Sequence, residues 1–420
     1  MSELAESPLA AGDRSLSVTQ ARAAIAAALR PITEMQTVAL AQALGRVLAA
    51  DVVSPIDVPA HDNSAMDGYA FAGNELHPTG PTRLQMVGTV LAGPPFEGSM
   101  QPGECLRIMT GAVMPAGLDT VVPHELCRAD GAQVVVEPGV IRPGENRRRR
   151  GEDLAAGRPA LQAGRVLRPA DLGLIASLGI ADVGVHRPLR VALFSTGNEL
   201  RTLGQALAPG CIYDSNRYSL MAALQRLGME VIDLGLVGDD PAALQAALAQ
   251  AVAQADVVLT SGGVSMGDAD HVRAVLAQMG EVAFWKVAMR PGRPFAFGPL
   301  RGGAAWLFAL PGNPVAALVT FYALAREALL QLAGARAQAL PVLQARCASA
   351  IRKRPGRTEF QRAVVEPDAA GAWQVRLTGS QGAGVLRSMS EANALLVLRH
   401  EQGSVAAGEM VDVWLFDGLV

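Results

Sequence analysis

The sequence predicts a multidomain protein in which an α/β domain is combined with two β domains and a small helical domain. In the central part of the chain, near-continuous apolar strands alternate with helical stretches, which is typical of a doubly wound, mostly parallel sheet. Short apolar runs separated by Gly, Pro and Asp turns lie on either side of that part and predict β structure. The chain has 420 residues, of which 50% are apolar and 18% charged, enough for about three packed domains.

The first part of the chain predicts helices. Ser17 can cap a helix over residues 18–29, and apolar residues repeat at helical spacing over 37–50. A further short helix is expected over 169–178, packed back on the first two. Between these helices, apolar runs over 83–91 and 105–109 predict strands of a small inserted β domain.

The central part predicts alternating strands and helices. Strands are expected over residues 189–195, 230–237, 256–260, 282–287 and 306–310. Helices are expected over residues 219–227, 241–253, 270–279 and 313–332. The last part returns to β structure, with strands expected over residues 340–350, 359–365, 373–377, 394–398 and 410–415.

These patterns divide the chain into four expected domains. They are a split N-terminal hinge domain (1–55 and 155–187), an inserted β domain (56–154), an α/β domain (188–335) and a C-terminal β domain (336–420).

Composition excludes several classes of protein. The net charge of −3 disfavours a nucleic-acid binder that works by phosphate neutralisation. The four cysteines are far apart and form no CxxC, which excludes a zinc ribbon and argues against a disulfide scaffold. Neither Lys286 nor Lys353, the two lysines, follows a glycine, so no Walker A motif exists, and GxGxxG and HExxH are absent. Because no run of 18 apolar residues or basic, apolar leader occurs, we expect a cytoplasmic protein without membrane contact.

Ligands of an open parallel sheet bind beyond the carboxyl ends of its strands. The loops expected there cover residues 195–199, 238–240, 261–270, 289–293 and 311–313. The loop around Ser261, Gly262 and Gly263 can point backbone N–H groups at an anion. Positive charge comes from Lys286, Arg290 and Arg293, and carboxylates that suit Mg²⁺ come from Glu199, Asp239, Asp240, Asp268 and Asp270. The sequence therefore predicts a phosphorylated or nucleotide-like ligand with a divalent cation.

Ordinary structural roles compete with this interpretation. Asp240-Pro241 and Asn313-Pro314 are typical first residues of helices, and Ser-Gly-Gly is a common turn. The arginine run 147–150 is typical of a solvent-exposed surface. Lys286 is more informative, because this chain uses arginine almost everywhere else and the two side chains are not interchangeable.

Several segments in this order resemble one family. They are Asp62–Tyr69, Met109–Pro115, Arg148–Asp153, Ser261–Ser265, Phe284–Gly292 and Leu310–Pro314. Together they closely resemble the MoeA family, the molybdopterin molybdenumtransferases, whose eukaryotic relatives include the E domain of gephyrin. The resemblance extends from about residue 16 to the end.

The resemblance implies an enzyme that inserts molybdenum from molybdate into adenylylated molybdopterin and releases AMP with the help of Mg²⁺. It implies a MogA-like third domain, a C-terminal β-barrel-like domain and an elongated homodimer. It also implies small-molecule substrates and transient contact with a molybdopterin adenylyltransferase and molybdoenzyme maturation proteins. A molybdopterin-binding scaffold and a MogA-like adenylyltransferase are the alternatives; the lack of a long linker disfavours the first, and the two β domains disfavour the second.

The resemblance also assigns site residues. Those expected in catalysis are Asp62, Thr110, Glu199, Asp239, Asp270, Lys286 and Arg290, with Glu199, Asp239 and Asp270 near the metal and pyrophosphate. Those expected to bind substrate are Arg148, Asp153, Ser261, Gly262, Gly263, Arg293, Pro311, Gly312, Asn313 and Arg362. The chain departs from the family pattern at Arg290 and Arg293, where lysine is frequent, and at Ala383, where serine is frequent.

Overall fold

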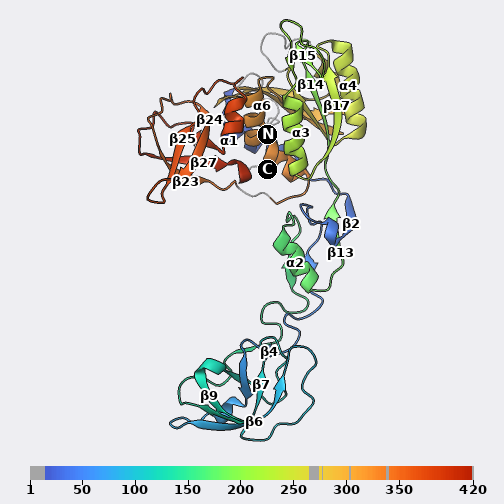
Figure 1. Cartoon of the computed structure of the whole chain (residues 1–420). Coiled ribbons are helices and arrows are strands. Elements are labelled where there is room, and N and C mark those ends of the chain that lie inside the picture. The colour runs from blue at the N-terminus through green and yellow to red at the C-terminus, as the bar shows by residue number, and fades with distance from the viewer. Residues whose placement is uncertain (1–14, 264–273, 277, 302–303, 337–339, 419–420) are drawn as a thin grey trace, which may run out of the picture.

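The computed structural model describes residues 15–418 except 264–273, 277, 302–303 and 337–339. The molecule is elongated (Figure 1). An α/β unit and a C-terminal barrel lie together at one end, a small unit that contains α2 lies in the middle, and a β unit with β6 and β7 lies at the far end. We call these parts the α/β unit, the barrel, the hinge unit (33–54 and 155–187) and the distal unit (56–154). The domain boundaries expected from the sequence stay a prediction.

The α/β unit is built on one sheet, whose described strands follow the order β1-β19-β21-β22-β18-β14-β17. The strands are β1 (Ser15–Leu16), β14 (Arg190–Thr196), β17 (Glu230–Val237), β18 (Val257–Ser261), β19 (Ala283–Val287), β21 (Pro294–Leu300) and β22 (Ala305–Leu310). β17, β14, β18 and β22 are parallel neighbours. β21, which the sequence analysis missed, is antiparallel to both β19 and β22. β19 therefore runs in the same direction as β22, and its carboxyl end lies at the same edge.

Helices cover both faces of this sheet. They are α1 (Val18–Ala28), α3 (Asn216–Arg226), α4 (Pro241–Gln254), and one long helix made of α6 (Pro314–Thr320), a π-helical segment (Phe321–Ala325) and α7 (Arg326–Leu332). The Ser17 side chain accepts a hydrogen bond from the Gln20 amide, as expected of the N-cap of α1. The helix expected over 270–279 falls mostly outside the described residues, but 274–276 and 278–279 are helical.

The long helix Pro314–Leu332 is apolar enough to cross a membrane by length and composition, but 67% of its most apolar window is buried inside the protein. Its side chains join a core that also contains Ile25 of α1, Leu193 of β14 and Phe308 of β22. The helix is therefore a core helix, and α1 packs with the α/β unit rather than with α2.

The hinge unit joins two distant stretches of chain. β2 (Met35–Ala39) pairs with β13 (Asp182–His186), and β3 (Val52–Val53) pairs with β12 (Pro159–Leu161). α2 (Pro169–Ser177) packs against them. The helix expected over 37–50 is wrong: that segment holds the end of β2 and a short 3₁₀ turn. Pairing with β13 overrides its helical periodicity, and Gly45, with φ of +75°, lies outside the helical region.

The distal unit is a small β structure. Its strands are β5 (Gly68–Phe71), β6 (Thr82–Val90), β7 (Glu104–Ile108), β8 (Thr120–Pro123), β9 (Cys127–Asp130) and β10 (Gln133–Val136), in the order β8-β5-β7-β6-β10-β9. β4 (Asn63–Ser64) pairs with β11 (Arg147–Arg148) beside this sheet. The two strands expected from the sequence agree with β6 and β7 within one residue at each end.

The C-terminal strands close into a barrel. They are β23 (Leu343–Cys347), β24 (Thr358–Pro367), β25 (Trp373–Leu377), β26 (Ala394–Leu398) and β27 (Met410–Leu415), with α8 (Arg387–Glu391) before β26. Their order is β24-β25-β23-β27-β26, and β26 pairs back with β24. β20 (Met289–Arg290), which follows β19, pairs in parallel with β24 and so joins the barrel to the α/β unit.

Candidate functional site

The carboxyl edge of the α/β sheet brings the Gly-rich loops together. Gly262, which follows β18, has φ of +97°, and a Cβ there would lie 2.3 Å from the Thr196 carbonyl oxygen at the end of β14. The Gly262 amide donates to the Leu310 carbonyl at the end of β22 (3.1 Å). The loops after three neighbouring strands therefore pack backbone against backbone, and glycine is needed where they approach so closely.

A buried polar network below this edge holds the loops in place. Asn216 Nδ2 donates to Ser261 Oγ (2.6 Å) and to the Gly312 carbonyl (2.7 Å). Ser195 Oγ donates to Asp214 Oδ1 (3.1 Å), and Asp214 is 2% exposed. The Ser261 hydroxyl therefore faces the interior, where it positions the loop. The sequence analysis missed Asp214 and Asn216, although the polar run 214–217 at the start of α3 was a usable signal.

Two of the expected acidic residues lie in adjoining loops at this edge. Asp239 Oδ1 accepts from Thr196 Oγ1 (2.5 Å), and Oδ2 accepts from the Asn198 amide (3.2 Å). Glu199 directly follows Asn198 and is exposed. Asp240 instead caps α4, since it accepts from the Ala243 amide (2.8 Å), so the capping interpretation is confirmed.

Asp268 and Asp270 lie outside the described residues. Among the residues that are described, no group of three or more His, Cys, Asp or Glu could hold a metal ion by itself. Mg²⁺ is usually held by one or two carboxylates together with substrate phosphates and water. Asp239 and Glu199 therefore fit such an ion.

Basic residues gather where the sheet meets the barrel. Lys286 is half-buried on β19, and Arg290 and Arg293 are exposed after it. Arg362 on β24 is fully buried: its Nε donates to Ser388 Oγ (3.0 Å) and its Nη2 to the Gly382 carbonyl (3.0 Å).

Arg362 is an unusual buried cation. Burial, and to a smaller extent the nearby charge of Arg290, lowers the pKa of Arg362 to about 10. In the described part of the chain no carboxylate forms an ion pair with Arg362. A buried guanidinium that lacks a carboxylate and is repelled by a second arginine favours an anion from outside the chain.

The barrel also contacts the start of the long helix. The Val315 amide donates to the Ala383 carbonyl (3.0 Å), so the barrel loop that accepts from Arg362 lies against the residues after β22. Asn313 precedes α6 and is exposed, and its side chain makes no capping hydrogen bond within the described structure. The side chain of Asn313 therefore does not cap α6 in the described structure, contrary to the expectation. This contact brings Pro311, Gly312 and Asn313 close to the barrel loop whose carbonyl accepts from Arg362.

The remaining expected site residues lie in the distal unit, which the hinge unit separates from the α/β sheet (Figure 1). These residues are Asp62, Thr110, Arg148 and Asp153. Within one chain the structure does not bring them to the carboxyl edge.

Thr110 and Asp62 are both held by hydrogen bonds in the distal unit. The amide and hydroxyl of Thr110 both donate to Asp67 Oδ1 (2.7 Å each), and these two bonds lower the pKa of Asp67. Asp62 Oδ1 accepts from the Arg150 amide (2.8 Å). The sequence analysis missed Asp67, which is the second aspartate of the segment that contains Asp62.

The fold and site together define a multidomain α/β protein whose basic residues gather where its sheet meets a barrel. Three family models match successive parts of the chain: "MoeA N-terminal region (domain I and II)" over residues 16–179, "Probable molybdopterin binding domain" over 192–331 and "MoeA C-terminal region (domain IV)" over 344–416.

Individual relatives agree with these models. The chain is 41% identical over 406 residues to the molybdopterin molybdenumtransferase of Haemophilus influenzae, covering 96% of this chain and all of that protein. It is 38% identical over 396 residues to molybdopterin molybdenumtransferase 2 of Mycobacterium tuberculosis, covering 92% and 95% of the two chains. The crystal structure of a MoeA protein from Pyrococcus horikoshii matches with a TM-score of 0.81 and 26% identity over 96% of this chain and 100% of that one. The chain therefore belongs to the MoeA family of molybdopterin molybdenumtransferases.

Proposed function

We propose that this chain inserts molybdenum from molybdate into adenylylated molybdopterin and releases AMP. Membership of the family supports a transferase of molybdenum cofactor biosynthesis. The observation that carries the proposal for the site is the fully buried Arg362, which lacks a carboxylate partner in the described chain and lies close enough to Arg290 to be repelled by it.

Molybdate is a tetrahedral oxyanion, and guanidinium groups donate paired hydrogen bonds to such groups. We assign molybdate to the joint between β20, β24 and the barrel loop, where Arg362 and Arg290 meet. The departure from lysine to arginine at position 290 keeps the charge and adds a planar donor set. Ala383 offers its carbonyl to Val315 and no hydroxyl, so the oxyanion contacts come from the arginines.

The phosphoanhydride of the second substrate suits the carboxyl edge. Gly262, Gly263 and Gly312 place peptide groups there, and backbone N–H groups of such loops can donate to phosphate oxygens. Lys286 supplies positive charge on the same side of the sheet. Asp239 and Glu199 would hold Mg²⁺, which when bound neutralises phosphate oxygens as AMP leaves.

We further propose that the working enzyme is a homodimer with composite sites. Asp62 and Thr110 are remote from the carboxyl edge of their own chain, so a second copy would have to bring them to it. In an isologous dimer, an Asp62→Ala subunit paired with an Asp239→Asn subunit has one site with both lesions and one with neither. The purified heterodimer is expected to recover up to about half of wild-type activity per dimer. Complete inactivity of a folded heterodimer would contradict the shared site.

The proposed reaction is tested by measuring AMP release from adenylylated molybdopterin with and without molybdate. We expect molybdate to accelerate release, and no adenylylated pterin to form from ATP and molybdopterin. Formation of that compound would support an adenylyltransferase instead, whereas binding of the pterin without turnover would support a scaffold. A cytoplasmic location and transient contact with the upstream adenylyltransferase and molybdoenzyme maturation proteins belong to the same proposal.

A further inference from the structure

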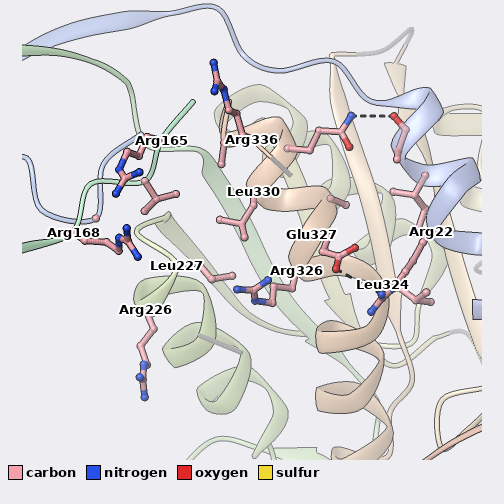
Figure 2. Close-up of a pocket in the computed structure, with 17 residues that line it drawn as sticks. Arg22, Arg165, Arg168, Arg226, Leu227, Leu324, Arg326, Glu327, Leu330 and Arg336 are labelled. Atoms are coloured by element: carbon pink, nitrogen blue, oxygen red, sulfur yellow. Dashed lines mark hydrogen bonds and ion pairs between the residues drawn. The ribbon is translucent and has the colours of Figure 1, made fainter. Parts of the chain in front are cut away.

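A second arginine-rich region lies at the opposite edge of the sheet. It is a cavity of about 610 Å³ between the hinge unit, α1, the end of α3 and α7 (Figure 2). The long helix starts at the carboxyl edge with Pro314, and Arg326 lies about 18 Å further along it at roughly 1.5 Å per residue. Arg226, at the end of α3, likewise precedes the amino end of β17. The cavity is therefore separate from the proposed catalytic site.

The charge of the cavity is strongly unbalanced. Six arginines and one carboxylate, Glu327, are among the described residues that line it; the arginines are Arg22, Arg165, Arg168, Arg226, Arg326 and Arg336. Just outside the lining, Asp171 pairs with Arg165 (2.7 Å) and Arg168 (3.8 Å). Even with both carboxylates counted, the arginines outnumber them three to one.

Two of these arginines share one carboxylate. Arg22 Nη1 lies 3.6 Å from Glu327 Oε1. Burial lowers the pKa of Arg22, and Glu327 offsets part of this effect. Burial also lowers the pKa of Arg326, where Glu327 again offsets the effect and the charge of Arg22 adds to it. The two guanidinium groups are therefore close enough to repel each other.

Two hydrogen-bond donors of the lining residues also lack an acceptor in the described structure. Arg22 Nη2 and Arg165 Nε are buried and have no hydrogen-bond partner in the described structure. Arg22 belongs to α1 and Arg165 to the hinge unit, and they line the cavity from opposite sides (Figure 2). A buried donor without an acceptor costs free energy, and a phosphate on Arg22 would offer an acceptor to its Nη2.

Apart from Gln331, the other side chains of the described lining are apolar. Leu227 and Leu330 lie near Arg326 in Figure 2, Leu324 lies beside Arg22, and Ile25 also lines the cavity. A volume of this size with apolar walls and a few polar groups is typical of a small-molecule site. An inorganic anion would make no apolar contact with the leucine side chains of the lining.

We propose that this cavity binds a phosphorylated small organic molecule, with the phosphate on Arg22 and Arg326 and the apolar body on Leu227 and Leu330. This second site goes beyond the transferase activity and does not depend on it.

The proposal can be tested by calorimetric titration of the full-length protein with phenyl phosphate at low ionic strength. This probe has a phosphate and an apolar ring but is no substrate of the proposed reaction. We expect saturable binding to the wild type, at least about tenfold weaker binding to Arg326→Gln, and unchanged binding to Arg290→Gln and to Arg83→Gln, an exposed arginine of the distal unit.

Phenol and inorganic phosphate serve as partial probes, and each is expected to bind at least about tenfold more weakly than phenyl phosphate. Arg326→Gln removes both a repulsion from Arg22 and an attraction to Glu327, so thermal unfolding without ligand checks that the variant is folded. If that variant fails to fold, Arg22→Gln replaces it, with the same expectation. Absence of saturable binding at about 10 mM probe, or loss of binding in Arg290→Gln instead, would overturn the proposal. Equal binding of inorganic phosphate would overturn the assigned apolar body.

Discussion

The two arginine-rich regions lie at opposite edges of one sheet and differ in how the chain builds them. At the carboxyl edge, loops that follow successive strands supply glycine backbone, carboxylates and Arg290, and β24 of the barrel adds Arg362. At the amino edge, arginines from α1, α3, α7 and the hinge unit surround an apolar cavity with one carboxylate. The first region combines groups needed for chemistry on phosphates, whereas the second contains only groups needed for binding.

This difference explains why variants in the two regions should behave differently. Loss of a group at the carboxyl edge should reduce turnover, whereas loss of an arginine in the cavity should change binding or stability and leave turnover intact. Four variants, in order of decreasing expected effect, test this contrast.

Arg362→Lys should have the largest effect. Lysine keeps a positive charge, but its single nitrogen cannot replace Nε and Nη2, which donate to Ser388 and to the Ser380 and Gly382 carbonyls, and also reach an oxyanion. We expect molybdate-dependent AMP release to fall by about 100-fold, or roughly 2.7 kcal/mol of transition-state stabilisation. Arg376→Lys, on the neighbouring strand β25 and 56% exposed, is the matched control and should keep full activity. Equal activities of the two variants would show that Arg362 does not contribute to molybdate-dependent AMP release.

Asp239→Asn should have the next largest effect. The amide keeps the volume and can still accept from Thr196, but it removes the charge proposed for Mg²⁺. We expect at least about a tenfold loss of turnover, about 1.4 kcal/mol, with little change in thermal stability. Asp240→Asn is the control, because asparagine caps a helix as well as aspartate does. An active Asp239→Asn enzyme would show that this carboxylate does not serve the metal.

Lys286→Arg should have a smaller effect. The substitution keeps the charge on β19 but replaces a compact ammonium with a larger planar group. We expect a several-fold loss of kcat/KM with no loss of thermal stability, measured by AMP release and by thermal unfolding. Full activity would mean that the scarcity of lysine in this chain was a misleading signal.

Asp171→Asn should leave turnover intact and affect only stability. Burial raises the pKa of Asp171, but the hydrogen bond from Arg165 and the Arg168 amide outweigh burial, so the net shift is downward. A carboxyl with a depressed pKa stabilises the fold above its unfolded pKa, and this contribution is lost as the pH falls through the folded value.

We therefore expect Asp171→Asn to unfold about 1–3 kcal/mol more easily at neutral pH. The difference from wild type should shrink below about pH 4, where the carboxyl becomes protonated. Denaturant unfolding at several pH values measures this, and a pH-independent difference would contradict the ion-pair explanation.

Much of the carboxyl edge could be predicted from the sequence because position in a parallel sheet follows from strand order. Gly262, Asp239 and Asn313 all follow apolar strands, and topology places them at one edge. Arg362 could be assigned only through the family resemblance, since nothing in the pattern of β24 reveals that a buried arginine lacks a carboxylate.

Other features of the fold could not be predicted from the sequence pattern. The strand β2 was mistaken for helix because its partner, β13, is more than 140 residues away in the chain. β21 was missed because Gly298 and Pro299, which are uncommon inside strands, interrupt its run of apolar residues. The arginine cavity has no motif, because its arginines come from four distant segments whose proximity exists only in the folded chain.

The most direct test of the account is a molybdate titration of three proteins: the wild type, Arg362→Lys and Arg326→Gln. The account places molybdate at the joint of the sheet and the barrel, so its affinity should fall at least about tenfold in Arg362→Lys and stay unchanged in Arg326→Gln. Loss of molybdate binding in Arg326→Gln with full binding in Arg362→Lys would place the oxyanion in the other arginine-rich region and contradict the account.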